Sequence, residues 1–498
     1  MPMHTTRLTL AAALIFITFH RGAAQVMYGA VLGNYAGVNS IQLNPSAMHN
    51  SKMYLDVQLM GFDVFLQNNY LYIPAAEYRF SNFFKTGYVW PSHTEEYGTE
   101  ERNFYHYSNK RDKNAFFQSR INGPGAMLLY NRHAFALTTA VRTIVSADKI
   151  PDDLANFMYL GLNYEPQQDI RYTDYGPVTV SGMAWGELGL SYSNVVYARD
   201  FTRIAAGITV KRLFGLGGMY VNVKQVDYIV PDDSTLDIRN LDAEMGLSIP
   251  VDYNTNDILA SPVFKGGGFG IDLGVTYTRF AKYHTEQYFD QLCARPYEDY
   301  KFRLGVALID LGGIRFRNNA TRMRIDNRSA YWTNVNRMDY QSVGQLLDTL
   351  SYMFYGDTVS AYTGNRFTLW LPSALSLQFD YHFRKNWYFN ASLIQGFAVA
   401  KGAIARPAEL TITPRYETDW FEASLPVSLY HWQLARIGLA VRVFGVTVGT
   451  DKLGGFFHIS DFTGLDFYMS VKFFLDKGKC RTRGPVHCGG NEPKRIRF

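Results

Sequence analysis

Eight charged residues stand out in this sequence because each occupies a polar position in a segment where polar and apolar residues alternate. They are Arg142, Lys211, Asp272, Arg303, Asp380, Arg442, Asp466 and Lys472. Successive side chains of a strand point to opposite faces, so each charge would lie opposite an apolar row. These residues could line a permeation path or bind a polar head group. They could equally form the internal ion pairs that a polar interior requires.

The sequence does not indicate an enzyme. Ser376 and His382 share one polar face, but six residues of strand separate their side chains by about 20 Å, too far for a nucleophile and its base. The glycine run at 265–270, KGGGFG, precedes a strand pattern, whereas a phosphate loop opens a helix. No metal-type cluster of His and Cys is present either. We therefore expect no catalytic residues, no metal and no cofactor.

The segment 371–397 shows most clearly which elements must position these charges. Leu375, Leu377 and Phe379 alternate with polar residues, a polar turn follows at 384–386, and the alternation resumes from Trp387. This pattern predicts a hairpin with one apolar and one polar face. Each arm has about ten residues, which is what a tilted strand needs to cross a bilayer.

Composition extends this interpretation to the whole chain. The protein has 498 residues, of which 15% are aromatic, yet its mean hydropathy is −0.15. Alternating strands dilute their apolar residues, and membrane barrels carry aromatic girdles. We predict an all-β fold, a transmembrane antiparallel β-barrel of about 14 strands (16 as the alternative), with outer-membrane lipid around it. A net charge of +5 is too small to indicate a nucleic-acid partner.

The expected elements include long extracellular loops at 80–122 and 318–365, with short helices near 151–161 and 343–353. Separate strands are expected at 201–213, 219–230 and 435–449, and a glycine at a phase shift predicts a bulge at Gly61. The competing fold is a secreted, soluble all-β protein, such as a propeller or a pair of sandwiches. Soluble strands average five or six residues, so segments as long as 182–197 favour the barrel.

The two ends of the chain differ from the strand region. Residues 1–24 combine basic residues, an apolar run and small residues before Gln25, which is typical of a secretory signal peptide. A membrane helix is the alternative, but twelve apolar residues are too few to span. We predict a lead-in at 25–52, the barrel at 53–475 and a basic periplasmic tail at 476–498.

The tail offers two open questions. Cys480 and Cys488 could form a disulfide in an oxidising compartment or remain two unpaired thiols. The basic residues of the tail could contact an anionic or protein partner, or they could simply be solvated.

The lead-in has no strand pattern but carries regularly spaced asparagines. Asn34, Asn39 and Asn44 could satisfy backbone groups that lack a strand partner, and Pro45 fixes a turn after Asn44. We predict that this segment plugs the barrel lumen. A disordered periplasmic leader is the alternative.

Four short motifs carry a family resemblance. The run Leu43-Asn44-Pro45-Ser46-Ala47 resembles the opening of FadL-type outer-membrane proteins. The runs at 268–274 (GFGIDLG), 307–312 (ALIDLG) and 371–375 (LPSAL) are similar to an uncharacterised family of Bacteroidota outer-membrane barrels, with PorV and PorP as more distant relatives. The FadL resemblance implies 14 strands, a lumen hatch and passage of hydrophobic molecules. The PorV and PorP resemblance implies a part in type IX secretion or gliding.

Two functions follow as expectations. The first is passive or gated transport of a small apolar molecule through an exported outer-membrane barrel with an N-terminal plug. The alternative is a non-transporting scaffold or secretion accessory that binds envelope proteins through its loops, which are rich in residue types enriched at interfaces.

Overall fold

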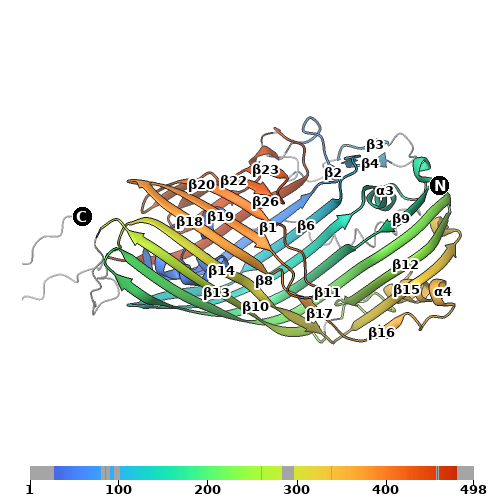
Figure 1. The fold of residues 1–498 in the computed structure, drawn as a ribbon, viewed down its shortest axis with the longest axis horizontal. Coiled ribbons are helices and arrows are strands. Elements are labelled where there is room, and N and C mark those ends of the chain that lie inside the picture. The colour runs from blue at the N-terminus through green and yellow to red at the C-terminus, as the bar shows by residue number, and fades with distance from the viewer. Residues whose placement is uncertain are drawn as a thin grey trace, which may run out of the picture.

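A computed structural model describes residues 27–79, 85, 90–94, 101–259, 261–282, 297–337, 339–455, 457 and 459–478. Within these residues the chain forms a closed antiparallel barrel of 14 strands, as the alternation predicts (Figure 1). The first strand, β1 (Met53–Asn68), pairs with the last, β26 (Gly464–Asp476), and this pairing closes the barrel. No helix of the described part is long and apolar enough to cross a membrane.

The wall follows chain order, and several positions in it are built from two consecutive strands. Its strands after β1 are β6 (Lys113–Asn122) with β7 (Gly125–Tyr130), β8 (His133–Ile150), β10 (Val178–Arg199), β11 (Thr202–Asp232), β12 (Thr235–Ser248) with β13 (Gly266–Phe280), β14 (Tyr300–Phe316) with β15 (Ala320–Trp332), β17 (Phe367–Trp370) with β18 (Ala374–Arg384), β19 (Trp387–Gly396), β20 (Glu409–Glu417), β21 (Phe421–Ser424) with β22 (Val427–Tyr430), β23 (Leu434–Ile437) with β24 (Leu439–Val443), and β25 (Val446–Thr450).

Shorter helices and strands lie at one end of the barrel. They are β2 (Leu71–Tyr72), β3 (His93–Thr94), β4 (Glu101–Arg102), β5 (Tyr105–His106), α3 (Asp152–Leu160), η4 (Glu165–Gln167), β9 (Arg171–Tyr175), η6 (Val335–Arg337), α4 (Val343–Tyr355), β16 (Tyr362–Gly364) and η7 (Leu453–Gly455). The helices α3 and α4 confirm the two predicted loop helices. The opposite end carries two-residue turns, such as 131–132 and 385–386, in which Asn131 and Lys385 adopt positive φ. We call these the long-loop end and the short-turn end.

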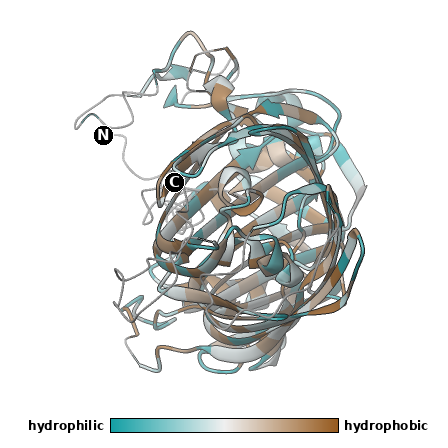
Figure 2. Cartoon of the chain, turned by 90° about the vertical axis from the view of Figure 1, so that its left-hand side faces the viewer, coloured by the Kyte–Doolittle hydropathy of each residue, from teal (hydrophilic) through white to brown (hydrophobic). Residues whose placement is uncertain are grey.

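The two faces of the wall have opposite chemistry, as the hairpin at 371–397 predicts. Phe379 and Phe389 are each 40% exposed on the outer face, whereas Ser376 and Asp380 are buried on the inner face. The same alternation recurs around the ring of strands (Figure 2). An apolar exterior and a polar interior are the arrangement of a barrel that spans a membrane.

Four sequence predictions about elements were wrong. The two strands expected within 201–230 form one continuous 31-residue strand, β11 (Thr202–Asp232), because the glycines at 215, 217 and 218 continue the ladder instead of ending it. Residues 435–449 form a hairpin around Phe444 and Gly445, where Phe444 adopts the positive φ of a tight turn. The expected loops at 80–122 and 318–365 each contain a strand, β6 and β15, whose aromatic and polar composition obscures the alternation.

One further prediction about the wall has a clear outcome. The predicted irregularity near Gly61 is confirmed, because the pairing of β1 with β26 shifts register between Gln58 and Met60. At the long-loop end, at the right of Figure 1, β12 and β15 pair with each other and continue the sheet from residues 218–232 of β11. The proposed signal peptide, Cys293, Cys480, Cys488 and most of the basic tail lie outside the described residues.

Candidate functional site in the barrel lumen

The lead-in lies inside the ring of strands as three short helical turns, α2 (Tyr28–Val31), η1 (Gly37–Gln42) and η2 (Pro45–Asn50), and most of its residues are buried. Hydrogen bonds to the inner face hold it. The Val38 amide donates to Asp56 on β1 at 2.8 Å, and Asn39 donates to Ser470 on β26 at 3.0 Å. Apolar residues of the lead-in pack in the same core cluster as residues of the wall.

The Asn-Pro-Ser turn anchors the lead-in to β13 and β18. Asn44 caps η2 by accepting from the Ser46 amide at 2.9 Å, and Pro45 occupies the first helical position, where its missing N–H costs no hydrogen bond. The Asn44 side chain also donates to Gln378 at 3.0 Å. The hydroxyl groups of Ser46 and Thr276 lie 2.6 Å apart. The turn is therefore both a local cap and a contact between the lead-in and the wall.

Three inward-facing glycines make room for this turn. A Cβ at Gly274 would lie 2.1 Å from Asn44 Oδ1, and one at Gly207 would lie 2.6 Å from the Ser46 nitrogen. At Gly305 an added Cβ would meet Gln378 at 2.2 Å and Asn44 at 3.0 Å. Real Cβ atoms essentially never approach another atom as closely as 2.1, 2.2 or 2.6 Å, so glycine at these positions lets the turn, and Gln378 that bonds to it, lie this close to the backbone of the wall.

We expect Gly274→Ala to displace the Asn-Pro-Ser turn from the wall, because the new methyl group would overlap Asn44. Limited proteolysis of the folded barrel in detergent should then cut the lead-in at least about tenfold faster than in the wild type. Gly186→Ala is the matched control, since its only close neighbour, Phe214 Cβ, is 4.0 Å away. Equal cleavage rates for Gly274→Ala and the wild type would contradict the anchoring role.

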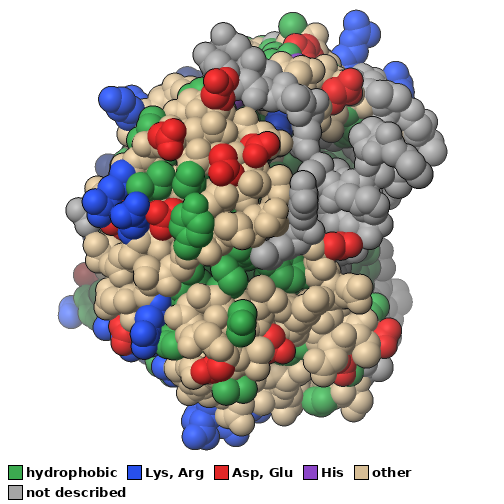
Figure 3. All heavy atoms as spheres, turned by 90° about the vertical axis from the view of Figure 1, so that its right-hand side faces the viewer, with side chains coloured by type: hydrophobic (Ala, Val, Ile, Leu, Met, Phe, Trp, Pro, Cys, Tyr) green, Lys and Arg blue, Asp and Glu red, His purple; other side chains and the backbone are tan. Residues whose placement is uncertain are grey.

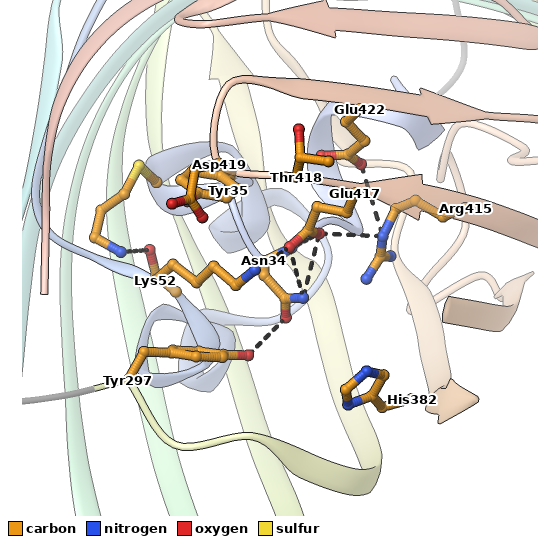
Figure 4. A network of polar contacts seen from close by, with 12 residues as sticks. Asn34, Tyr35, Lys52, Tyr297, His382, Arg415, Glu417, Thr418, Asp419 and Glu422 are labelled. Carbon is orange, nitrogen blue, oxygen red and sulfur yellow. Dashed lines mark hydrogen bonds and ion pairs between the residues drawn. The ribbon is translucent and has the colours of Figure 1, made fainter. Parts of the chain in front are cut away.

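A second anchor, which we call the lower clamp, lies near the short-turn end and centres on Glu417 of β20 (Figure 4). The Glu417 carboxylate accepts from the backbone and side-chain amides of Asn34 at 3.1 and 3.0 Å. It also pairs with Lys52 at 2.8 Å and Arg415 at 3.3 Å. Two cations and an amide thus share one buried carboxylate, which ties Asn34 and the C-terminal end of the lead-in, Lys52, to the same strand.

The Lys52 ammonium group of the lower clamp keeps its charge at neutral pH. Burial lowers the pKa of Lys52, but the attraction and hydrogen bond of Glu417, together with the attraction of Tyr297 and Asp419, outweigh burial, and the pKa of the ammonium group is raised. A raised pKa means that the stabilisation by this pair is complete below the ordinary lysine pKa and is lost only as pH rises through the higher folded value. The lower clamp is therefore not a switch within the physiological pH range.

Neighbouring cations complete the attachment of the lead-in. Arg303 on β14 donates to the Asn34 side-chain oxygen at 2.6 Å. Arg442 lies 4.1 Å from the centre of the Tyr35 ring and pairs with Glu422 at 3.1 Å. Lys472 donates to the carbonyl groups of residues 35 and 36. The Lys472 ammonium group thus supplies a donor to the residue 35 carbonyl and a second donor to the residue 36 carbonyl, which also accepts from the Asn39 amide at 3.1 Å.

A third cluster, the Asp310 network, lies on the inner face of the wall. Arg142 donates to both Asp310 oxygens at 2.9 and 3.0 Å, and Lys211 pairs with Asp310 at 2.7 Å and with Asp272 at 2.8 Å. Arg406, from the segment after β19, approaches Asp310 at 3.5 Å. Glu187 accepts from Arg120 at 2.8 Å and Arg142 at 3.3 Å. The network links six strands, β6, β8, β10, β11, β13 and β14, with one loop segment.

The Asp310 network also joins the sequence motifs. Asp310 adopts a φ of +58° at a bulge in β14, and its amide donates to Asp272 at 2.7 Å. Its carbonyl group accepts from the Ser373 hydroxyl at 2.7 Å, and the Leu371 amide donates to the Gly312 carbonyl at 2.9 Å. The motifs at 268–274, 307–312 and 371–375 therefore meet at one place in the wall.

The structure brings six of the eight predicted charges together in two groups. Arg142, Lys211 and Asp272 belong to the Asp310 network, whereas Arg303, Asp380 and Arg442 surround the lower clamp, with Asp380 at 3.9 Å from Arg303. The lead-in residues Asn34, Asn39, Asn44 and Pro45 are buried. Arg415, Glu417 and Asp310 were not predicted. Arg415 and Glu417 follow the alternation of β20 and could have been found, but Asp310 points inward beside Ile309 only because the bulge breaks the alternation.

The comparisons with known proteins place the chain in a family. Residues 45–451 match the family described as "Family of unknown function (DUF5723)". The chain belongs to this family. The match begins at Pro45 and includes the three motifs that meet at Asp310. No curated protein matches the sequence.

Solved structures of similar architecture have low identity to this DUF5723 protein. A mutant of the TodX monoaromatic hydrocarbon channel has 9% identity and a TM-score of 0.43, with 92% of this chain and 100% of that chain covered. A FadL homologue of Pseudomonas aeruginosa has 12% identity and a TM-score of 0.39, covering 91% and 99%. The Pseudomonas putida toluene transporter TodX has 9% identity and a TM-score of 0.30, covering 91% and 99%.

Among the described residues, no group of His, Cys, Asp or Glu could hold a metal ion.

Proposed function

We propose that the protein is an exported outer-membrane barrel that transports a small apolar molecule and that residues 27–50 act as its lumen plug. The observation that carries the proposal is the attachment of the lead-in, which fills space between strands through hydrogen bonds and ion pairs and not as part of the wall. A segment held this way can leave its site without breaking the barrel. The predicted signal peptide at 1–24 would direct the chain to the envelope.

The chemistry around the plug supports an apolar cargo. Met27, Tyr28 and Val31 of the lead-in belong to a buried cluster with Phe65, Trp185 and other wall residues. Movement of the plug would uncover these side chains and leave an apolar surface inside the barrel. The charged Asp310 network would remain fixed to the wall and keep the strands in register during that movement.

A reversible lock tests this function. Ser46 and Thr276 have hydroxyl groups 2.6 Å apart, so their Cβ atoms are close to the separation that a disulfide requires. In a background in which Cys293, Cys480 and Cys488 are serine, the double variant Ser46→Cys/Thr276→Cys should tie the plug to β13. When cells of a Gram-negative host that carry this double variant are treated with an oxidant, they should take up the apolar fluorophore N-phenylnaphthylamine no faster than cells without the barrel.

Reduction of the same cells should restore uptake to the level of the serine background, because only the cross-link differs. Each single-cysteine variant is a control for oxidation by itself. Uptake that is the same with the lock closed and open would contradict plug-gated transport.

The scaffold function has support from a separate observation. The sheet formed by β12, β15 and residues 218–232 of β11 extends beyond the barrel and exposes apolar side chains, including Tyr331 (64%) and, on the neighbouring α4, Tyr352 (58%). Exposed aromatic residues are enriched at protein interfaces. Purification from native membranes in mild detergent should yield a stoichiometric partner if the protein is a scaffold, and the barrel alone if it is a transporter.

A further inference from the structure

We propose that a cleft at the long-loop end binds a neutral carbohydrate, a ligand distinct from the apolar cargo proposed for the lumen. The cleft has a volume of about 810 Å³ and lies between residues 108–112, α3 and the segment 164–177. Its volume is within the range of ordinary ligand sites. The elements that form it stand at the right of Figure 1, at the end of the barrel that Figure 3 shows face on.

The cleft is lined by polar groups and by planar aromatic rings. Side-chain amide and hydroxyl groups come from Ser108, Asn109, Asn156 and Gln167, and aromatic rings come from Tyr164 and Tyr172. Its aliphatic side chains are Ile170 and three prolines, Pro151, Pro166 and Pro177. A hydrophobic ligand needs apolar walls, whereas a sugar presents hydroxyl groups to amides and C–H faces to rings.

The charges of the cleft favour a neutral ligand. Asp152 is already paired with Lys113 at 2.8 Å. The remaining lining charges are two lysines, Lys110 and Lys149, and two aspartates, Asp112 and Asp153, and these balance. Neither a strongly anionic nor a strongly cationic ligand would gain from this balance.

Two amides of the cleft are held in fixed orientations. Asn156 Oδ1 accepts from the Tyr70 hydroxyl at 2.8 Å, which directs its NH₂ group away from Tyr70. Gln167 is 2% exposed and donates through Nε2 to the carbonyl group of Gly161. Within the described residues, Gln167 Oε1 has no hydrogen-bond partner. A buried acceptor without a donor is rare, and a sugar hydroxyl would satisfy it.

The test uses the mature chain in lipid nanodiscs and saturation-transfer NMR with four probes: maltohexaose, cellohexaose, xylohexaose and chitohexaose. We expect at least one to bind with a Kd of about 1 mM or lower. Gln167→Leu, which keeps the volume but removes the acceptor, should weaken that binding at least about tenfold. Tyr164→Ala should weaken it as well, by removing a ring face.

Gln168→Leu, next in sequence but outside the cleft lining, should bind like the wild type. Heat-modifiable migration of each variant on a denaturing gel verifies that its barrel is folded. Failure of all four sugars at about 5 mM would overturn the proposal. Unchanged sugar binding by Gln167→Leu would also overturn the proposal. So would saturation transfer to casein peptides, used as a peptide probe, in the absence of transfer to the sugars.

Discussion

Deletion of residues 27–47 should leave a folded barrel that conducts at least about tenfold more ions in planar bilayers than the intact protein. The wall strands pair with one another without help from the lead-in, so the ladder from β1 to β26 survives the deletion. The contacts removed are those of Asn34, Asn39 and Asn44 with the inner face. Water can solvate the charges left behind, such as Glu417 and Asp56.

Two measurements interpret the conductance. Heat-modifiable migration shows whether the deleted protein is still a barrel, and Lys52→Ala, which removes one contact of the lower clamp, should give an intermediate conductance. A folded deletion variant that conducts no more than the intact protein would refute the plug. It would also remove the main support for gated transport, leaving the scaffold as the better hypothesis.

Asp310→Asn should destabilise the barrel by about 3 kcal/mol or more, because breaking a buried ion network leaves cations without their counter-charge. Arg142 and Lys211 both depend on the Asp310 carboxylate, and their side chains are nearly inaccessible to water. Asparagine tolerates the positive φ of this position, so the substitution removes the charge while keeping the backbone conformation. Urea unfolding in detergent micelles, followed by tryptophan fluorescence, measures the difference.

Asp200→Asn is the matched control. Asp200 also has positive φ, at +55°, but it lies in an exposed turn where its ion pair with Arg199 spans 3.9 Å. Exposed pairs contribute little, so this variant should unfold within about 0.5 kcal/mol of the wild type. If Asp310→Asn were as stable as Asp200→Asn, the network would not be what holds β14 to its neighbours.

The family resemblance in the sequence acquires a physical meaning from these contacts. The Asn-Pro-Ser turn requires glycine at 207, 274 and 305, because a side chain there would occupy its space. The three other motifs converge where Asp272, Asp310 and Ser373 bond to one another. These short motifs, far apart in the chain, therefore form two contacts: the Asn-Pro-Ser turn of the lead-in packs against the wall, and the other three motifs meet within the wall.

The sequence by itself determined the fold class, the faces of the regular strands and turns such as the one near 385, because alternation and turn chemistry are local properties that neighbouring residues encode. It also identified the asparagines of the lead-in and the polar-face charges. Only the tertiary structure decided which charges meet, because Asn34 and Glu417 are 383 residues apart and no local pattern joins them. It alone revealed Asp310, whose inward direction comes from a bulge that the paired strands impose. Periodicity specifies the face of a strand, whereas closure of the barrel specifies the neighbours across its lumen.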